Sequence, residues 1–252
     1  MAESKPSVAV VSGRYPVSDF ESASNHKVYC DRHGYAYFNC AWPTTHENRY
    51  LNKMEYVRAH YGLFDYVFWI DDDAFFLDLD QSLEPYLPKG DAFISFCASP
   101  SHKSIHTYIS SGQFGLRCDD TGRAFIDEVA RVDLRQVQRW WTDDLGYFTR
   151  GDQDSMVYLL KTDPRFALYD RHEHTAFNQR AEEVLDGDDV FIVHFTGPVP
   201  VKLKNYKRVQ RHLGRGPSLL PFEEARRWQL EEVTRRLRHR VERKVIRWLE
   251  QH

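Results

Sequence analysis

The chain has 252 residues, of which 42% are hydrophobic and 28% charged, with a formal net charge of −3. This composition is that of an ordinary globular protein, and the length suffices for one large α/β domain or two small ones with a sizeable core. No window approaches the roughly 18 apolar residues of a membrane-spanning helix, and the N-terminal apolar run is too short for a secretory signal, so we expect a cytoplasmic protein or one from which an anchor was removed.

The first 70 residues alternate between strand and helix patterns. In chain order, strands are expected at residues 8–11, 35–40 and 66–70, with helices at 23–32 and 47–62 between them. Gly34 and Gly62 are suited to end the two helices. The third strand is apolar on consecutive residues, which is typical of a strand covered on both faces in a parallel sheet. This βαβαβ order predicts the start of a doubly wound α/β sheet.

The elements that follow are shorter. Strands are expected at residues 91–97, 111–118 and 189–197, and helices at 120–132 and 152–162. No internal repeat and no low-complexity linker interrupts them. We therefore expect one domain over residues 1–218, with a separate tail over residues 219–252.

The tail is predicted to be a basic amphipathic helix. Its apolar residues recur every three or four positions, and Pro221 lies near its expected start. From residue 201 onward the net charge is +9, so the first 200 residues carry −12. Such a helix could pack on the acidic body, pair with a second copy in a homodimer, or lie peripherally on an anionic membrane surface.

The cysteines are scattered along the chain. They are Cys30, Cys40, Cys97 and Cys118, and none forms a C-x-x-C pair. This spacing speaks against zinc or a disulfide framework and favours free buried thiols in a reducing compartment, with pairing of Cys30 and Cys40 as the alternative.

Three consecutive carboxylates, Asp71, Asp72 and Asp73, directly follow the strand at residues 66–70. In an open α/β sheet, ligands bind outside the carboxyl ends of the strands. Residues i and i+2 of an extended chain point to the same side, so Asp71 and Asp73 can face one point. Two oxygen donors at one point suit Mg²⁺ or Mn²⁺. A solvated acidic loop is the alternative, but the apolar flanks favour metal binding.

The stretch around these carboxylates, VFWIDDDAFFLD, resembles the D-x-D segment of nucleotide-sugar glycosyltransferases of the GT-A fold. More narrowly, the chain resembles the family of fungal α-galactosyl- and α-mannosyltransferases and plant xyloglucan α-xylosyltransferases. The supporting motifs are, in order, NHKVYCDRHGY (25–35), YLNKMEYVRAH (50–60), SSGQFGLRC (110–118), GDQDSM (151–156) and VHFTG (193–197). The resemblance fades beyond about Tyr206.

This resemblance implies a GT-A catalytic domain over residues 1–218, Rossmann-like, with a mostly parallel central sheet and flanking helices. It further implies a metal-dependent, retaining hexosyltransferase that uses Mn²⁺ or Mg²⁺. The donor would be a nucleoside-diphosphate sugar carrying a hexose or pentose, with UDP favoured over GDP and galactose favoured. The acceptor would be a hydroxyl of a glycan or a lipid-linked saccharide.

The resemblance also assigns metal ligands. Asp71 and Asp73 match the metal-binding triplet, and His194 matches the third protein ligand, although a lone His after an apolar strand is more often a core residue. Lys202 is expected to reach the β-phosphate of the donor, with Lys204 as its rival. An exposed lysine is the plain alternative for both.

Further residues are expected to bind the nucleotide sugar. Ser12, Gly13, Arg14 and Tyr15, after the first strand, would meet the base and ribose, with a plain turn as the alternative. The other members of this set are Asp72 at the ribose or sugar, Lys53 near the phosphates or sugar (or on the helix surface), Gly112, and Gly197.

The GDQD motif is expected to bind the transferred sugar and to be catalytic. Gln153 matches an amide that retaining families place on the β-face of the sugar, and Asp152 would bind sugar hydroxyls or the acceptor. Helix capping is the alternative for Asp152 and Asp154. Ser110 stands where the family has asparagine, so the sugar specificity does not transfer directly.

Three other functions fit the sequence less well. A nucleotide-sugar hydrolase would use similar residues, with water in place of the acceptor. A non-catalytic carbohydrate-binding protein would be expected to have lost the metal ligands, which are present. A nucleic-acid partner is not expected, because the body is acidic and no recognised binding motif is found.

Overall fold

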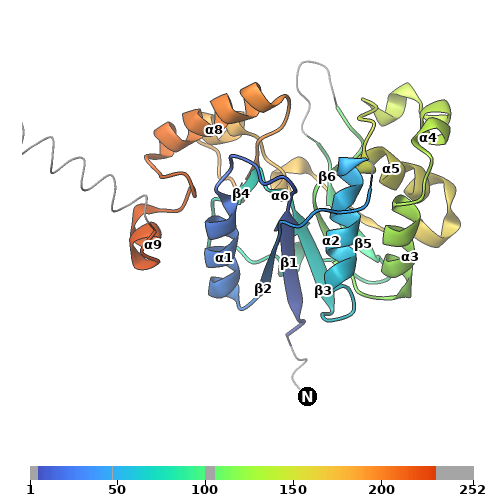
Figure 1. The fold of residues 1–252 in the computed structure, drawn as a ribbon, viewed down its shortest axis with the longest axis horizontal. Coiled ribbons are helices and arrows are strands. Elements are labelled where there is room, and N and C mark those ends of the chain that lie inside the picture. The colour runs from blue at the N-terminus through green and yellow to red at the C-terminus, as the bar shows by residue number, and fades with distance from the viewer. Residues whose placement is uncertain (1–4, 47, 100–105, 231–252) are drawn as a thin grey trace, which may run out of the picture.

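The computed structural model describes residues 5–46, 48–99 and 106–230. Its strands form a six-stranded central sheet in the order β2-β1-β3-β6-β5-β7 and a two-stranded sheet of β4 and β8 (Figure 1). The strands are β1 (Val8–Gly13), β2 (Ala36–Cys40), β3 (Tyr66–Ile70), β4 (Ala74–Phe76), β5 (Ile94–Cys97), β6 (Ser110–Arg117), β7 (Asp170–His172) and β8 (Ile192–His194). The longer helices are α1 (Ser22–His33), α2 (Asn52–His60), α3 (Asp120–Val129), α5 (Asp152–Thr162) and α8 (Val199–Leu213), and the shorter ones are α4 (Leu134–Trp140), α6 (His174–Phe177), α7 (Ala181–Asp186) and α9 (Phe222–Arg227).

The central sheet is mostly parallel, as predicted. β1 pairs in parallel with β2 and β3, β5 pairs in parallel with β7, and only β6 runs against its neighbours β3 and β5 among the described strands. The chain enters β1 from below in Figure 1, so the carboxyl ends of the parallel strands lie at the top, near α8. The mixed α/β class, with a mostly parallel sheet and flanking helices, is therefore confirmed.

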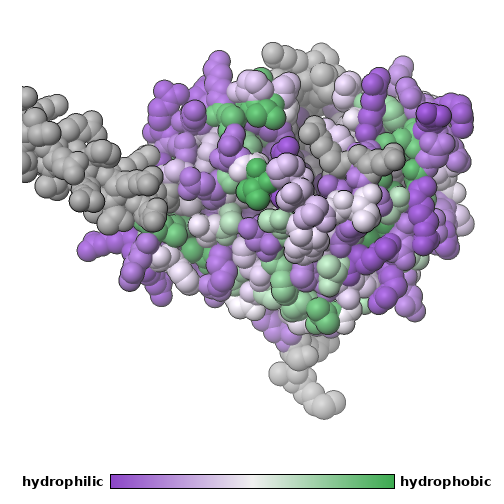
Figure 2. Space-filling view, viewed as in Figure 1, coloured by the Kyte–Doolittle hydropathy of each residue, from purple (hydrophilic) through white to green (hydrophobic). Residues whose placement is uncertain are grey.

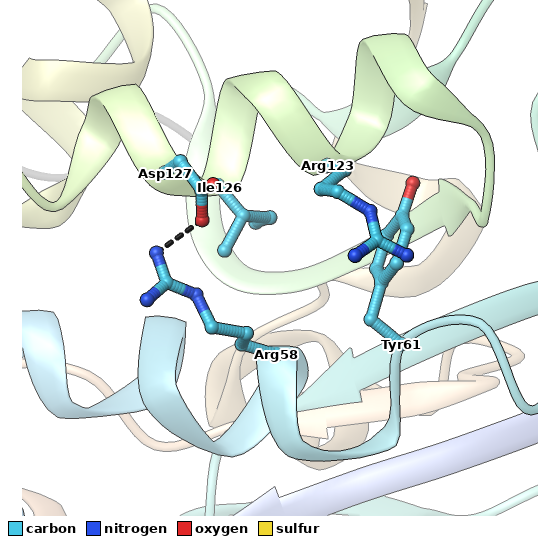
Figure 3. A pocket seen from close by; sticks show the side chains of 5 residues that line it. All are labelled: Arg58, Tyr61, Arg123, Ile126 and Asp127. Atoms are coloured by element: carbon cyan, nitrogen blue, oxygen red, sulfur yellow. Dashed lines mark hydrogen bonds and ion pairs between the residues drawn. The ribbon is translucent and has the colours of Figure 1, made fainter.

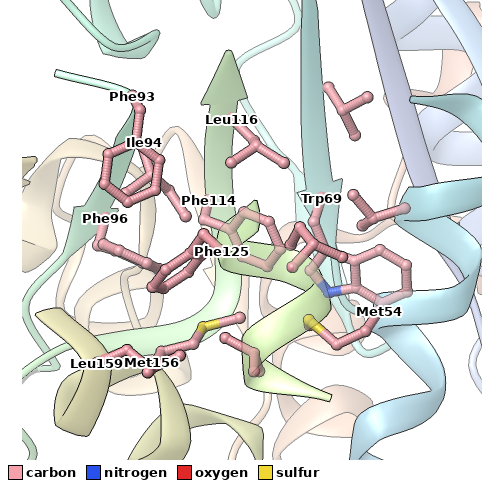
Figure 4. Close-up of a cluster of buried hydrophobic side chains, with 14 of the residues drawn as sticks. Met54, Trp69, Phe93, Ile94, Phe96, Phe114, Leu116, Phe125, Met156 and Leu159 are labelled. Carbon is pink, nitrogen blue, oxygen red and sulfur yellow. The ribbon is translucent and has the colours of Figure 1, made fainter. Parts of the chain in front are cut away.

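Consecutive residues of the central strands pack on opposite faces of the sheet. On one face, Val11 and Trp69 belong to a cluster closed by α2, α3 and α5, drawn in Figure 4. On the other face, Val10 and Phe68 belong to a cluster closed by α1, α6 and α9. Alternation of this kind is what buries both faces of a strand at once, and it explains the continuous apolar run that precedes the three carboxylates.

The small sheet places the last strand beside the three carboxylates. β4 and β8 pair in antiparallel register, with Ala74 opposite His194. The predicted strand at 189–197 thus exists as β8, but it joins β4 and not the central sheet. A third apolar cluster, which includes Phe75, Phe195 and Tyr206, holds this small sheet against α7 and α8.

The C-terminal residues divide between a described and an undescribed part. Leu219 and Leu220 are buried, and Leu220 belongs to the cluster beside α1. Most of the predicted basic helix falls on residues 231–252, which lie outside the described residues, so the division at 218/219 stays a prediction. Among the described residues, no helix has the length and apolar character needed to cross a bilayer.

The surface and the cysteines agree with a globular chain. On the face seen in Figure 2, hydrophilic residues prevail around the edge, and apolar residues form small separate groups, as is usual for protein surfaces. Cys30, Cys40 and Cys97 lie buried as free thiols, and Cys118 is half-buried.

Candidate active site

Asp71, Asp73 and His194 converge at the carboxyl end of β3. Asp71 follows β3, Asp73 precedes β4, and His194 ends β8, which pairs with β4. His194 Nε2 lies 3.2 Å from Asp73 Oδ1 and 3.9 Å from Asp71 Oδ2. One ligand atom from each residue lies within 4.8 Å of the others. The two carboxylates therefore meet at one point as predicted, although the chain between them is a turn, closed by the Ala74 N–H donating to the Asp71 carbonyl at 3.1 Å, and not the extended segment that was expected. This group could hold a metal ion.

The orientation of His194 is fixed by Asn178. Asn178 is buried, and its Nδ2 donates to the Ala98 carbonyl at 3.1 Å, which turns its Oδ1 toward His194 Nδ1, 3.0 Å away. This network places a ring proton on Nδ1, so Nε2 is the ring nitrogen that faces the carboxylates. Asp73 Oδ1 is buried and accepts no hydrogen bond from the described residues. A proton on Nε2 would pair with Asp73, and a metal ion bound at this point would take the place of that proton.

Lys202 balances part of this negative charge. Its ammonium contacts Asp73 Oδ2, the oxygen that His194 does not face. Burial opposes ionisation of Asp73, but His194 and Lys202 hold the pKa of its carboxyl well below the usual range. Burial acts to lower the pKa of Lys202, but the neighbouring Asp73 outweighs burial, so the pKa lies above its usual value. Lys204, the rival, is exposed on α8.

Lys53 is a buried bridge and not a surface lysine. Its Nζ lies 2.9 Å from Asp152 Oδ2 and 3.2 Å from Asp71 Oδ1, and it donates to the Ser111 carbonyl at 2.9 Å. Burial opposes its charge, but the two carboxylates raise its pKa above the usual range. The indole of Trp69 also donates to Asp71 Oδ1, at 2.7 Å. Asp71 is therefore held in place from two sides.

The first turn of α5 separates the roles of its carboxylates. Asp154 accepts hydrogen bonds from the backbone N–H groups of residues 149, 150 and 151, so helix capping belongs to Asp154. Asp152 is buried against Lys53; burial raises its pKa, and Lys53 opposes that rise. Gln153 Oε1 accepts from the Ser111 N–H at 3.3 Å, and its Nε2 is buried without a partner among the described residues.

Two adjoining clefts meet at this cluster. One, of about 350 Å³, is lined by Gly13, Arg14, Tyr15 and Asp72, and we name it the β1 cleft. The other, of about 400 Å³, is lined by Gly112, Asp152, Gln153 and His194, and we name it the α5 cleft. Both are bordered by Lys53, Asp71, Gly197 and Lys202. The predicted residues therefore lie around one continuous hollow, except for Ser12, which is buried at the end of β1 behind it.

Two glycines are required by close packing. A Cβ on Gly13, whose φ is +152°, would lie 2.0 Å from the Cys40 carbonyl oxygen. A Cβ on Gly112 would lie 2.3 Å from Cε1 of His194. Gly112 was expected to bind the nucleotide sugar. In the structure, its missing side chain also makes room for the imidazole of His194. Neither position tolerates a side chain without displacing its neighbour.

Several residues of the site were not predicted. Asn178 and Trp69 orient His194 and Asp71, and Arg180 lines the α5 cleft. Asn178 and Arg180 occur in a loop with no recognised motif, so only the fold reveals them. The i, i+2 spacing of Trp69 and Asp71 is visible in the sequence, but the direction of the indole N–H is not.

A further cleft lies between α2 and α3 and is shown in Figure 3. Arg58 and Asp127 form an ion pair there, and the Arg123 guanidinium lies over the ring of Tyr61. At about 160 Å³ it is smaller than the two clefts above, and none of the predicted site residues lines it.

The comparisons with known proteins agree with this geometry. A sequence model of the galactosyl transferase GMA12/MNN10 family matches residues 15–96, which include the three carboxylates. No curated protein sequence matches the chain. The chain therefore resembles a glycosyltransferase of the fungal family that its motifs predict, and the resemblance supports sugar transfer.

Solved structures show the same fold. One is a glycosyltransferase involved in glycosylation of the major capsid of the virus PBCV-1; it is 14% identical, with a TM-score of 0.61, and the match covers 82% of this chain and all of that one. Another is the apo-form glycosyltransferase GlyE of Streptococcus pneumoniae TIGR4, 14% identical, with a TM-score of 0.50, covering 91% of this chain and 64% of that one. At this identity the likeness concerns the fold alone.

Proposed function

We propose that the protein is a metal-dependent, retaining glycosyltransferase. It would move a hexose or pentose from a nucleoside-diphosphate sugar to a hydroxyl of a glycan or lipid-linked saccharide. The observation that carries this proposal is the convergence of Asp71, Asp73 and His194 at the border between two clefts, beside Lys53 and Lys202. A donor has two parts joined by a charged diphosphate, and the hollow has two compartments joined at a charged centre.

The residues present fit Mn²⁺ or Mg²⁺. Two carboxylate oxygens and one imidazole nitrogen are a donor set that these ions accept, and the buried Asp73 Oδ1 has no other donor among the described residues. When bound, the ion would neutralise charge that develops on the leaving diphosphate. Lys202 would add a second positive charge to the same phosphates, from the first turn of α8.

The β1 cleft would hold the nucleoside. Gly13, Arg14 and Tyr15 border it, and Ser12 lies buried behind Gly13 at the end of β1. Asp72 borders the same cleft and is positioned for the ribose or the sugar. UDP is favoured over GDP by the family resemblance, and the family described as galactosyl transferases favours galactose.

The α5 cleft would hold the transferred sugar. Gln153 would present its amide to the β-face of the sugar, because its Oε1 is held by Ser111 and its Nε2 remains free to donate. Asp152 would accept from sugar hydroxyls while Lys53 keeps it ionised. An amide is a poor nucleophile, so we favour attack of the acceptor on the same face that the diphosphate leaves. That path retains the anomeric configuration.

The end of the C-terminal tail, residues 231–252, is proposed to contact a membrane surface or a second copy of the chain. Its excess of positive charge supports attraction to anionic lipid. Two measurements on the chain with and without residues 231–252 separate these proposals. Loss of co-sedimentation with anionic liposomes on removal of these residues would support membrane contact, and loss of a dimer would support contact with a second copy.

The function is tested by thermal-shift and calorimetric screening of UDP- and GDP-sugars, with Mn²⁺ and with chelator. We expect a nucleotide-sugar to bind only with the metal, and we expect the transferred sugar in the product to keep its donor configuration. Release of free sugar at the same rate with and without saccharide acceptors would identify a hydrolase instead. Binding of sugars without any turnover would identify a carbohydrate-binding protein.

A further inference from the structure

Arg180 is a cation in the α5 cleft that forms no ion pair with any described residue. It follows Gln179, whose backbone carbonyl accepts from the His194 N–H at 2.7 Å, so its own position beside the cluster is fixed. Its side chain is half-buried and lines the α5 cleft together with His194 and Gln153. Its Nε is buried and has no hydrogen-bond partner among the described residues.

The acids that act on its charge are Glu182 and Glu183, neither forms an ion pair with it, and Glu183 is already engaged elsewhere. Glu183 Oε2 accepts from the backbone N–H of Arg180 at 2.7 Å, and Glu183 Oε1 lies 3.2 Å from His174 Nε2. Burial lowers the pKa of the Arg180 guanidinium, although the charges of Glu182 and Glu183 offset part of this shift. A half-buried charge without a partner is costly, and a bound anion would offset that cost.

The position of Arg180 indicates which part of the substrates it meets. It lines the α5 cleft and not the β1 cleft, whereas Lys53 and Lys202 line both. Its role is therefore distinct from that of the two lysines next to the proposed diphosphate position. The same cleft carries hydroxyl groups from Ser99, Thr107, Thr149 and Thr196, and the exposed ring of Tyr147. Hydroxyls and an aromatic ring suit a saccharide.

We propose that the acceptor is a saccharide with an anionic substituent, a carboxylate or a phosphate, and that Arg180 binds this substituent. The proposal rests on the proposed glycosyltransferase function and adds the charge class of its acceptor. The guanidinium would form a paired hydrogen bond with the anion, which neutral sugars cannot form. Selection of the acceptor would then depend on Arg180, while donor binding would not.

The test compares matched pairs of sugars that differ only in charge. The full chain, with UDP and Mn²⁺, is titrated with methyl glucoside against methyl glucuronide and with mannose against mannose 6-phosphate, by calorimetry or ligand-observed NMR. We expect the anionic member to bind about tenfold or more tightly. Arg180→Gln should remove this preference and leave UDP–Mn²⁺ binding unchanged, Arg180→Lys should restore part of it, and Arg208→Gln, at an exposed arginine of α8, should keep it.

The other outcomes overturn either this proposal or the proposed function on which it rests. Equal binding within the pairs, or no binding of any anionic sugar, would show that no anion site exists. Weaker UDP–Mn²⁺ binding by a correctly folded Arg180→Gln protein would place Arg180 at the diphosphate. A preference for UDP-glucuronate over UDP-glucose that Arg180→Gln abolishes would place the anion on the donor. A chain that binds the anionic sugars but no nucleotide would retain the Arg180 site and disprove the proposed function.

Discussion

Asp73, one of the proposed metal ligands, depends on the groups beside it for its ionisation. Asp73 is 4% exposed, yet its pKa is held low because Lys202 and His194 face its two oxygens. We expect Asp73→Asn and Asp71→Asn each to weaken Mn²⁺ binding by at least about 100-fold and to abolish sugar transfer, because each removes one anionic ligand.

The measurement is calorimetric titration of Mn²⁺, followed by a transfer assay with the best donor. Asp188→Asn, at an exposed carboxylate, is the matched control and should change neither quantity. Full activity in either ligand variant would disprove the mechanism.

Asn178 is expected to act by positioning His194. Asn178→Leu removes the acceptor for His194 Nδ1 and should weaken Mn²⁺ binding by about 10- to 100-fold. Asn178→Asp keeps an acceptor there and should restore most of the affinity. Electron paramagnetic resonance of bound Mn²⁺ reads this out without turnover. If Leu and Asp weaken binding equally, the role of Asn178 is packing and not orientation of the imidazole.

For single residues, spacing along the chain predicted the meeting of Asp71 and Asp73 but little else of the site. The i, i+2 rule predicted that Asp71 and Asp73 converge, but its premise of an extended chain was wrong: the Ala74 N–H donates to the Asp71 carbonyl at 3.1 Å and closes a turn there. The convergence therefore comes from this turn between β3 and β4. The same rule could not assign Asp152 and Asp154 of α5, since in a helix two residues apart point in different directions. Asn178 could not be predicted at all, because its contact with His194 depends on how a loop lies against β8.

Among the helices and strands, those of the N-terminal βαβαβ segment were predictable from the sequence, whereas α8 and β4 were not. Continuous apolar runs and helix-ending glycines identify β1, α1, β2, α2 and β3. α8 was missed because its start contains prolines and its length is rich in charge. Pro198 at its N-cap and Gly214 at its left-handed C-cap are nevertheless ordinary helix boundaries. β4 is three residues long, and only its pairing with β8 reveals it.

The NHK segment of α1 supports β4 from behind. Asn25 exchanges two hydrogen bonds with the backbone of Phe76, at 2.8 and 2.9 Å, and His26 Nε2 lies 2.8 Å from the Ala74 carbonyl. These contacts fix the segment that follows Asp73. The motif therefore has a structural explanation in addition to its family resemblance.

The buried His26 predicts a dependence of stability on pH. Burial lowers its pKa to about 4, from 6.5 in the unfolded chain. The folded state thus binds fewer protons than the unfolded state, so the contribution is complete above about pH 6.5 and is lost as the pH falls toward 4. The free energy of unfolding should drop by up to about 3 kcal/mol over this range.

Urea unfolding of wild type and His26→Gln at pH 7, 5.5 and 4 measures this term. The variant should be less stable at pH 7 and should lose less stability on acidification. His212→Gln, at an exposed histidine, should follow the wild-type curve. Parallel curves for wild type and His26→Gln would show that His26 does not titrate with unfolding.

For the whole molecule, the open question is where the catalytic domain ends. The family match ends at residue 96, and the motifs that carry His194 and Gln153 lie beyond it. The predicted boundary at 218/219 relied on a change in charge and periodicity. In the structure, Leu219 lies in the cluster around Phe75, Leu220 lies in the cluster beside α1, and Arg32 Nη2 pairs with Glu224 Oε1 at 3.0 Å. A change in charge along the sequence describes the surface of the protein, so it cannot reveal that Leu219 and Leu220 pack into the core.

We therefore expect residues 219–230 to contribute to the stability of the catalytic body. A chain of residues 1–218 should be less stable to urea than a chain of residues 1–230 by at least about 4 kcal/mol, because two buried leucines are lost. In the full chain, Leu220→Ala should cost about 2–5 kcal/mol, whereas Phe222→Ala, at a position 52% exposed, should cost little. Equal unfolding free energies for the two truncated chains, with a silent Leu220→Ala, would instead support a domain that ends at residue 218.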